Sequence, residues 1–460
     1  MVLIIDLLDA ITQIITQIFL LIWPITSKML VFEPQLKVIS YFFGSLFSVF
    51  LGLAAIISTV YLIMVLYVLF FVNGRKEPEK ALDFKKAPFV SIHIPTRNEL
   101  AAITCAKCCL DFDYPKDKME ILIGDDSDKP EISEKLREFA LKNSKLVKVI
   151  RREKNIGFKS GNLNNLIDHS KGDFFVIFDS DYVPQKDFLK RIISPLVEDK
   201  TLSATQARWN PANADQNFSS ILAASIVYVF HLISLPFLKK LSGTVMLCGS
   251  AEAVRRSDLE ALGKWELGSL TEDIEYSFRL IKADKKVLYL EGLECSCEVP
   301  FTARDLYRQQ MRWAYGVIKA LKKHFFSILQ SKNISFSKKL PLFVAGIGYT
   351  FTTILFLLFM SGMITLISLP VYPNYETTRY LLMNTLLSIL FTIGPVFASV
   401  LVLLIKKKIR YVARLLVSIF SIGIVSMVYV NLGVIKALAN KPMQWFLVSK
   451  NSNNLESEEP

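Results

Sequence analysis

Charged residues are missing from four long stretches of this 460-residue chain. None of the following contains Asp, Glu, Lys or Arg: Tyr41–Val72, Leu340–Leu369, Leu381–Ile405 and Leu415–Ile435. Each stretch can supply the roughly 20 residues that cross a hydrocarbon core. With 52% hydrophobic residues overall, these runs exclude an ordinary soluble protein and predict four membrane spans.

A fifth uncharged run, Ala10–Thr26, is shorter and contains Gln13, Gln17 and Pro24. It lacks a basic leader and a clear small-residue cleavage site, so we do not interpret it as a removed signal peptide. We expect this segment either to span the membrane or to lie in its interface.

The net charge of +12 is also typical of nucleic-acid binding, but the basic residues gather beside the uncharged runs. Examples are Arg75-Lys76, Lys85-Lys86 and Lys406-Lys407-Lys408. The positive-inside rule explains this pattern better. We therefore expect no nucleic-acid partner, an integral protein of the cell membrane, and a cytoplasmic position for residues 85–339. The residual positive charge would attract anionic lipid and an anionic donor.

Histidine and cysteine are scarce, with four His and six Cys. The spacing of Cys105, Cys108, Cys295 and Cys297 would allow a zinc site, but the first pair lies in a segment that reads as helical. In a reducing cytoplasm, structural disulfides are disfavoured. We therefore interpret the cysteines as free thiols.

These patterns predict four regions along the chain. Residues 1–84 form an N-terminal membrane region, and residues 85–339 form a cytoplasmic domain with interfacial helices. Residues 340–440 form C-terminal transmembrane helices, and residues 441–460 form a tail whose last residues, from Asn451, we expect to be disordered.

Ile221–Leu238 is also uncharged and long enough to span. A crossing there would place Asp179 and Asp273 on opposite sides of the membrane. We therefore expect a buried or interfacial helix.

Strands and helices alternate in the cytoplasmic region. The expected strands are Phe89–Pro95, Glu120–Gly124, Val147–Arg151 and Phe174–Phe178. Helices are expected between them, the first capped by Asn98 and another at about Gly161–Ser170. This alternation predicts an α/β fold with a mostly parallel sheet covered on both faces, in which ligands bind beyond the carboxyl ends of the strands.

Two carboxylates with one residue between them, Asp179 and Asp181, follow the last of these strands. Such a pair can hold a hard divalent cation, Mg²⁺ or Mn²⁺, against a diphosphate, and the metal neutralises the leaving group as charge develops on it. The same pattern is common in turns and helix caps. Taken alone, it indicates a metal site only weakly.

Asp125 and Asp126 follow the strand Glu120–Gly124 and suit the imide N–H of a uracil ring, although an Asx-turn is the better explanation of this cluster taken alone. Lys159 lies among glycines at a predicted helix start, where it and backbone N–H groups suit phosphate oxygens. The spacing is not that of a Walker loop. A glycine-opened helix with Lys159 on its solvated face is the alternative.

Two further clusters lie on predicted helices. Thr271-Glu272-Asp273 begins an amphipathic helix, so Thr271 is a natural cap and the acids suit its first turn; one acid also suits the role of general base for an acceptor hydroxyl. Gln309, Arg312 and Trp313 share one helix face. The arginine suits pyrophosphate and the tryptophan a sugar ring, or the face is an interfacial anchor.

In this order the clusters resemble the family-2 inverting glycosyltransferases of the cellulose synthase, hyaluronan synthase and glucomannan synthase type. The resemblance runs from about Val90 to Trp313. It includes these further segments: Pro95-Thr96-Arg97-Asn98-Glu99, Lys159-Ser160-Gly161-Asn162-Leu163-Asn164, Gln206-Ala207-Arg208-Trp209-Asn210, Cys248-Gly249-Ser250 and Glu298-Val299-Pro300.

The resemblance implies a Rossmann-like, nucleotide-sugar-binding glycosyltransferase A domain inserted between transmembrane helices. It makes Asp273 the catalytic base and assigns a divalent metal to Asp179 and Asp181. Donor binding would fall to Thr96, Glu99, Asp125, Asp126, Lys159, Asp179, Gln309 and Arg312. Acceptor binding would fall to Cys248, Gly249, Ser250, Glu272 and Trp313. A single base fits an inverting transfer, whereas a glycosidase needs a carboxylate pair about the scissile bond.

Three positions depart from the family pattern. Arg97 stands where relatives often have tyrosine, and Cys248 replaces an asparagine. The segment Trp445–Lys450 resembles a gating segment that closes over the nucleotide, but Val448 occupies its threonine position. Three spans after a cytoplasmic domain would also leave Trp445 outside the cell, so a gate and the span count disagree.

The leading hypothesis is processive, inverting transfer from a UDP-sugar to a growing β-linked polysaccharide that is extruded through the membrane. A single transfer to a lipid acceptor is the first alternative, and a non-catalytic scaffold or export subunit is the second. Neither the sugar nor the oligomeric state follows from the sequence, since donor specificity depends on pocket shape.

Overall fold

The computed structural model describes residues 2–26, 33–72, 87–368, 374–446 and 448–450. Its contacts divide the chain into two compact units. The helical unit comprises Met1–Ile63 and Thr350–Ala398, and the sheet unit comprises Met64–Tyr349 and Ser399–Pro460. The predictions made for Arg75-Lys76, for Lys85-Lys86 and for the residues from Asn451 onward lie outside the described residues.

The sheet unit contains a seven-stranded sheet in the order β3-β2-β1-β4-β6-β5-β7. The strands are β1 (Val90–Thr96), β2 (Met119–Asp125), β3 (Val147–Arg151), β4 (Phe174–Ile177), β5 (Leu202–Pro211), β6 (Glu252–Arg255) and β7 (Lys286–Cys297). Among these strands only β6 runs antiparallel to its neighbours, β4 and β5. The predicted α/β fold with a mostly parallel sheet is confirmed.

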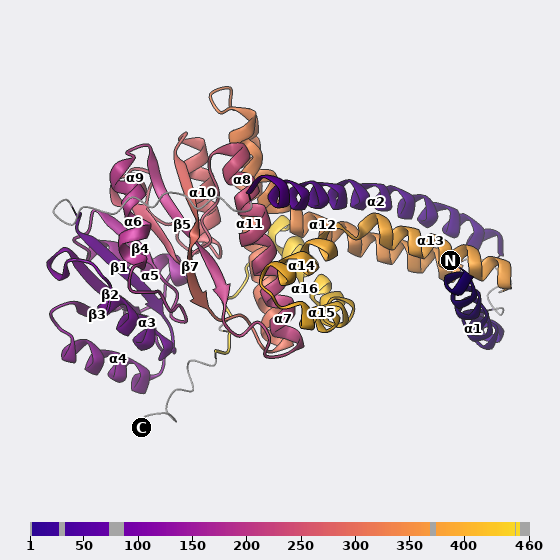
Figure 1. Cartoon of the computed structure of the whole chain (residues 1–460), viewed down its shortest axis with the longest axis horizontal. Coiled ribbons are helices and arrows are strands. Elements are labelled where there is room, and N and C mark those ends of the chain that lie inside the picture. The colour runs from indigo at the N-terminus through magenta and orange to yellow at the C-terminus, as the bar shows by residue number, and fades with distance from the viewer. Residues whose placement is uncertain (1, 27–32, 73–86, 369–373, 447, 451–460) are drawn as a thin grey trace. The chain divides into compact units, whose positions relative to one another are not determined.

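Helices cover both faces of this sheet (Figure 1). Its helices are α3 (Ala101–Leu110), α4 (Pro130–Lys142), α5 (Phe158–Asp168), α6 (Phe188–Glu198), α7 (Phe218–Val229), α8 (Leu235–Ser242), α9 (Arg256–Ala261), α10 (Glu272–Lys282), α11 (Ala303–Leu329), α15 (Val412–Ser418) and α16 (Ile424–Leu438). Val176 packs in the core shared with α3, α4 and α6, while Phe175 and Ile177 pack in the core shared with α5, α8 and α10. Because β4 is buried on both faces, its sequence is continuously apolar.

The helix cap predicted at Asn98 is wrong, and the cap at Thr271 has the predicted position without the hydrogen bond. Asn98 lies before Leu100, the residue that precedes α3, and its side-chain oxygen accepts hydrogen bonds from Asp128 N and Lys129 N instead. Thr271 does precede α10, but its hydroxyl makes no cap bond there. The expected helix at Gly161 begins earlier, at Phe158, because Gly157 adopts a left-handed conformation with φ of +78°.

The segment predicted as a buried or interfacial helix forms α7, a π-helical turn at Phe230–Ser234 and α8. It is apolar and long enough to cross a membrane, yet 78% of its most apolar window is buried within the protein. Ile409–Leu438 belongs to the sheet unit, and both its ends contact other segments of that unit. Tyr411 donates to Asp215 at 3.2 Å, and Lys322 donates to the carbonyl of Leu438 at 2.9 Å.

The helical unit contains α1 (Val2–Thr26), most of α2 (Glu33–Tyr67), and α13 (Tyr375–Thr392). Helices α12 (Phe336–Ser368) and α14 (Gly394–Ile405) connect it to the sheet unit along the chain. Gly394 N donates to Ser58 Oγ at 2.8 Å, and a Cβ at Gly394 would meet the Ser58 carbonyl at 2.2 Å. Only glycine therefore fits this helix contact.

In the described part of the chain, four helices are long and apolar enough to cross a membrane: Glu33–Phe71, Phe218–Ser242, Phe336–Ser368 and Ile409–Leu438. Helices α13 and α14 pass the same test together but bend by 56° at their junction. The region predicted as one span at Leu381–Ile405 is thus a broken helix pair.

Candidate active site

Lys159 lies at the centre of the acidic clusters. Its ammonium group is 2.8 Å from Asp179 Oδ1 and 3.2 Å from Glu272 Oε1, and it donates to the carbonyl of Gly249 at 2.6 Å. Burial would lower the pKa of Lys159, but the charges of Asp179 and Glu272 outweigh burial and raise it above its ordinary value. Lys159 therefore joins segments from β4, α10 and the loop before β6.

Asp273 lies in the first turn of α10, where the helix dipole favours an acid. Burial, followed by the charge of Glu272, raises the pKa of Asp273 to about 7. A Cβ built on Gly249, whose φ is +85°, would lie 3.3 Å from Asp273 Oδ2. The backbone of Gly249 thus packs directly against this carboxyl group, which has the pKa of an effective general base at neutral pH.

The loop Cys248–Ala251 also supports Asp179, because Asp179 N donates to Ser250 Oγ at 2.9 Å. Gln206 holds the loop from the sheet side by donating to the carbonyl of Ser250 at 3.0 Å and accepting from Cys248 N at 2.8 Å. The predicted acceptor residues Cys248, Gly249 and Ser250 therefore lie beside both Asp179 and Asp273.

Asp181 and Glu99 share one cation, Lys450. The ammonium group of Lys450 is 2.8 Å from Asp181 Oδ1 and 3.0 Å from Glu99 Oε2, and it donates to Ser180 Oγ at 2.8 Å. The second carboxylate oxygen of Asp181 accepts from Glu298 N at 3.1 Å. A positive charge therefore already lies among oxygens from three residues that follow the carboxyl ends of β1 and β4.

The tail that carries Lys450 runs along α11. Trp445 stacks on Phe158 with ring centres 6.2 Å apart, and the guanidinium carbon of Arg312 lies 4.2 Å from the centre of the Trp445 ring. Arg312 Nη1 donates to the carbonyl of Leu270 at 3.2 Å, whereas its buried Nε has no hydrogen-bond partner among the residues that the structure describes. The tail thus covers the arginine predicted to hold the donor diphosphate.

Helix α11 lies close to the start of α10. A Cβ at Gly316 would meet Thr271 Cγ2 at 2.4 Å, so only glycine fits this contact. Gln309, Arg312 and Trp313 are all partly buried on α11. Their predicted roles toward donor and acceptor stay predictions.

Asp125 is paired with Arg151, the last residue of β3, and Asp126 is paired with Arg152, which follows that strand. Asp125 Oδ2 accepts from Arg151 at 2.7 Å, and Asp126 Oδ1 accepts from Arg152 at 2.8 Å. Burial of Asp125 opposes its ionisation, but hydrogen bonds from Ser133, from Ser127 and from Arg151 hold the pKa of Asp125 below its ordinary value.

The same loop is tied to the first strand. Asp126 N donates to the carbonyl of Thr96 at 3.0 Å, and Thr96 Oγ1 donates to the carbonyl of Glu99 at 3.2 Å. Arg97, which replaces the family's tyrosine, pairs with Asp128 at 2.8 Å. Lys159, predicted to bind the donor, contacts Asp179 and Glu272 rather than Asp125 or Asp126.

Sequence reasoning missed Arg151, Arg152 and Glu252. The first two had a usable signal, because two arginines end one strand where two aspartates end its neighbour, and Asp125 is in register with Arg151. Glu252 had a weaker signal, an acid at the start of a short apolar strand.

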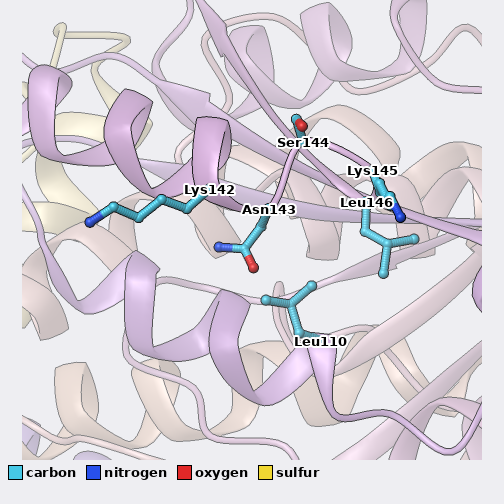
Figure 2. Close-up of a pocket in the computed structure, with 6 residues that line it drawn as sticks. All are labelled: Leu110, Lys142, Asn143, Ser144, Lys145 and Leu146. Carbon is cyan, nitrogen blue, oxygen red and sulfur yellow. The ribbon is translucent and has the colours of Figure 1, made fainter.

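The cysteines are free thiols. Among the residues that the structure describes, no group of three or more His, Cys, Asp and Glu is arranged to hold a metal ion. A shallow pocket of about 280 Å³ lies where α4 leads into β3, lined by Leu110 and residues 142–146 (Figure 2). That is the amino end of β3, whereas the acidic clusters follow the carboxyl ends of the strands.

The model of glycosyl transferase family group 2 matches residues 174–405, half of the chain. The chain belongs to this family. The predicted family-2 glycosyltransferase is thereby confirmed at the family level.

Curated relatives agree with this assignment. Glucomannan 4-beta-mannosyltransferase 7 of Arabidopsis thaliana is 29% identical over 297 residues, covering 60% of this chain and 52% of that protein. A probable glycosyltransferase, YdaM of Bacillus subtilis, is 27% identical over 278 residues, covering 57% of this chain and 66% of that protein. The chain spans about half the length of most of the curated relatives it matches.

A solved structure shares the fold. Mannosyltransferase PcManGT from Pyrobaculum calidifontis, in complex with GDP-Man and Mn²⁺, gives a TM-score of 0.58 at 17% identity and covers 88% of this chain and 100% of that chain. The predicted glycosyltransferase A type of fold with added apolar helices is confirmed.

Proposed function

We propose that this family member transfers a sugar, with inversion, from a nucleotide diphosphate sugar to a growing β-linked polysaccharide. The observation that carries the proposal is the position of Asp273. Its carboxyl group, with a pKa of about 7, packs on Gly249, whose carbonyl accepts from Lys159, and Lys159 contacts Asp179. The proposed base and the proposed diphosphate site would thus lie side by side at one edge of the sheet.

In the proposed step, the carboxylate of Asp273 takes the proton of an acceptor hydroxyl as its oxygen attacks the anomeric carbon of the donor. The bond from that carbon to the diphosphate oxygen breaks, and the nucleoside diphosphate leaves with the electron pair. The new glycosidic bond has inverted configuration because one displacement occurs. Lys159 and Arg312 would bind the leaving phosphates.

The residues present fit a divalent metal. Asp179 and Asp181 offer hard oxygen ligands, and Lys450 already occupies a cation position against Asp181. Mg²⁺ and similar ions use one or two carboxylates together with substrate phosphates and water. When bound, Mg²⁺ or Mn²⁺ would neutralise charge on the leaving diphosphate.

The nucleotide base would lie near Asp125 and Asp126. Their arginine partners, Arg151 and Arg152, fix both carboxylates in place before a donor arrives. The family resemblance favours a UDP-sugar, whereas the names of the glucomannan mannosyltransferase relatives add a mannosyl donor to the candidates. Nucleotide release from UDP-glucose, UDP-N-acetylglucosamine, UDP-glucuronate and GDP-mannose, compared side by side, would identify the donor.

We place the sheet unit in the cytoplasm of an integral membrane protein, with α12 and the bent pair α13–α14 as two crossings. The segment Ile409–Leu438 would lie along the membrane interface rather than cross, since both its ends contact the sheet unit. Two crossings return the tail to the cytoplasm. This removes the conflict between the span count and a gating role for Trp445–Lys450, which we propose closes over the donor.

Product length tests the proposal against a single transfer to lipid. Membranes containing the protein, supplied with radiolabelled donor, should yield a polymer that a β-specific glycanase digests. A glycolipid bearing one sugar, with no polymer, would replace the leading function. If the Asp273→Asn variant, still folded, transferred sugar at the wild-type rate, Asp273 would not be the base; a non-catalytic scaffold would instead be favoured if the folded wild type transferred sugar from no donor.

A further inference from the structure

The loop Cys248–Ala251 forms one side of the site, and the glutamate that follows it, Glu252, holds it against the sheet. Its Gly249 carbonyl accepts from Lys159, and the Cα of Gly249 faces the Asp273 carboxyl group. A small displacement of this loop would therefore move backbone atoms relative to the base. The position of an acceptor hydroxyl between them depends on where the loop is held.

The loop adopts an unfavourable backbone conformation. Gly249 has φ of +85°, and Ala251 has φ of +50°. An alanine in the left-handed region costs free energy because its Cβ approaches the carbonyl oxygen. Such conformations persist only where surrounding contacts fix them.

Glu252, the first residue of β6, supplies part of those contacts from the sheet, beside the bonds that Gln206 makes to Cys248 and Ser250. Its Oε2 accepts hydrogen bonds from Gly249 N at 2.9 Å and from Cys248 N at 3.2 Å. The residue is only 1% exposed. A carboxyl group buried this deeply is costly unless hydrogen bonds satisfy it, and here both bonds go to the loop that packs on Asp273.

We propose that Glu252 is a positioning residue for the acceptor, which sets the distance between the loop Cys248–Ala251 and the base Asp273. This inference rests on the proposed function, since it assigns the loop to the acceptor side of that reaction. Glu252 acts through the backbone of Cys248 and Gly249 and takes no part in the bond-making step.

Two substitutions separate the hydrogen bonds from the charge. Glu252→Gln keeps the side-chain length and an oxygen acceptor, whereas Glu252→Asp keeps the carboxyl group but is one methylene too short. We expect the full-length Glu252→Asp variant to lose hydrogen-exchange protection in a peptide covering residues 246–252, and Glu252→Gln to retain it. Equal exchange in Glu252→Asp and wild type would overturn the anchoring role without any activity measurement.

The kinetic arm uses whichever of UDP-glucose and GDP-mannose the wild type turns over, with cellotetraose or β-1,4-mannotetraose as the acceptor probe. Glu252→Asp should raise the KM for the acceptor about tenfold and leave donor hydrolysis by water within about twofold of wild type. The Glu252→Gln variant should have the same KM for the acceptor as wild type. A general loss of folded protein would instead lower the rates of sugar transfer and donor hydrolysis together and leave the KM for the acceptor unchanged.

Glu120 provides a matched control. It is another buried glutamate of the same sheet, accepting from Ser91 Oγ at 2.8 Å and from Lys171 N at 2.6 Å, at the amino end of β2. Glu120→Asp should leave the acceptor KM unchanged. If wild type transfers sugar but Glu252→Asp has a normal acceptor KM, the inference fails while the proposed function stands; if wild type transfers from no donor, the proposed function fails and hydrogen exchange still decides the anchoring.

Discussion

The ammonium group of Lys450 lies 2.8 Å from Oδ1 of Asp181, although the two residues are far apart in the sequence. Burial would lower the pKa of Lys450, but Asp181 and Glu99 outweigh burial and raise it above its ordinary value. The tail therefore places a permanent positive charge on a carboxylate that we assign to the metal. A divalent cation must displace that charge.

We predict that replacing Lys450 by Met strengthens Mn²⁺ binding in the absence of donor. Asp181 and Glu99 would lose their competing cation, and a change of about 1.4 kcal/mol corresponds to about tenfold in affinity. Electron paramagnetic resonance of free Mn²⁺ measures the change. Lys450→Arg should behave as wild type, and Lys441→Met is a control in the same tail. Identical Mn²⁺ affinity in Lys450→Met and wild type would show that Lys450 does not compete.

Asp273→Asn should lower the transfer rate by roughly 10²- to 10⁴-fold, the usual contribution of a general base. In wild type the rate should rise with pH to a plateau above about 7, because the pKa of Asp273 is about 7 and the base must lose its proton. Nucleotide release measured from pH 5 to 9 checks both expectations. A wild-type profile that lacks an inflection near neutral pH would contradict the assignment.

The same carboxyl group links stability to pH. The folded state raises the pKa of Asp273 to about 7, so it binds this proton more tightly than the unfolded chain does. Its contribution to stability is fully present below the ordinary pKa of aspartate and is lost as the pH rises through 7. The unfolding temperature of the Asp273→Asn variant should therefore equal that of wild type at pH 4 and be higher than that of wild type at pH 8. The reverse order would mean that the carboxyl group is ionised in the folded protein well below pH 7.

Trp445→Ala should weaken donor binding. The indole ring stacks against the guanidinium group of Arg312, a contact worth about 1–2 kcal/mol when partly desolvated, which corresponds to about 5- to 30-fold in affinity. The KM for the donor measures the loss. Phe446→Ala, which removes a similar contact with Arg308, is the matched control. Equal effects of the two substitutions would mean that the tail acts as a whole and not through Arg312.

Labelling from either side of the membrane tests the topology. An epitope inserted after Lys332 and another fused after Pro460 should be reached from the same side in sealed vesicles, because we place only two crossings between them. Both epitopes should be labelled once the vesicles are permeabilised, which shows that neither is hidden by the fold. Epitopes on opposite sides would mean that Ile409–Leu438 crosses and that the tail cannot close over the site.

The alternation of strands and helices was predictable because it depends on local hydrophobic patterns. Val147–Arg151 matches its predicted strand, and Asp179 follows the apolar run that forms β4. The convergence of the acidic clusters was predictable too, since parallel strands present their carboxyl ends at one edge of a sheet. The cap at Asn98 was not predicted correctly, because its side chain accepts hydrogen bonds from Asp128 N and Lys129 N, which lie about 30 residues away in the sequence.

The sequence by itself determined the fold class, the family and the order of the acidic clusters, because these depend on short motifs and on the spacing of apolar residues. Only the tertiary structure decided which charges pair. It brought Lys450 to Asp181, Lys159 to Asp179 and Glu252 beneath Gly249. Such pairings join segments that are far apart in the chain, and they follow from strand order and helix packing, which no local pattern encodes.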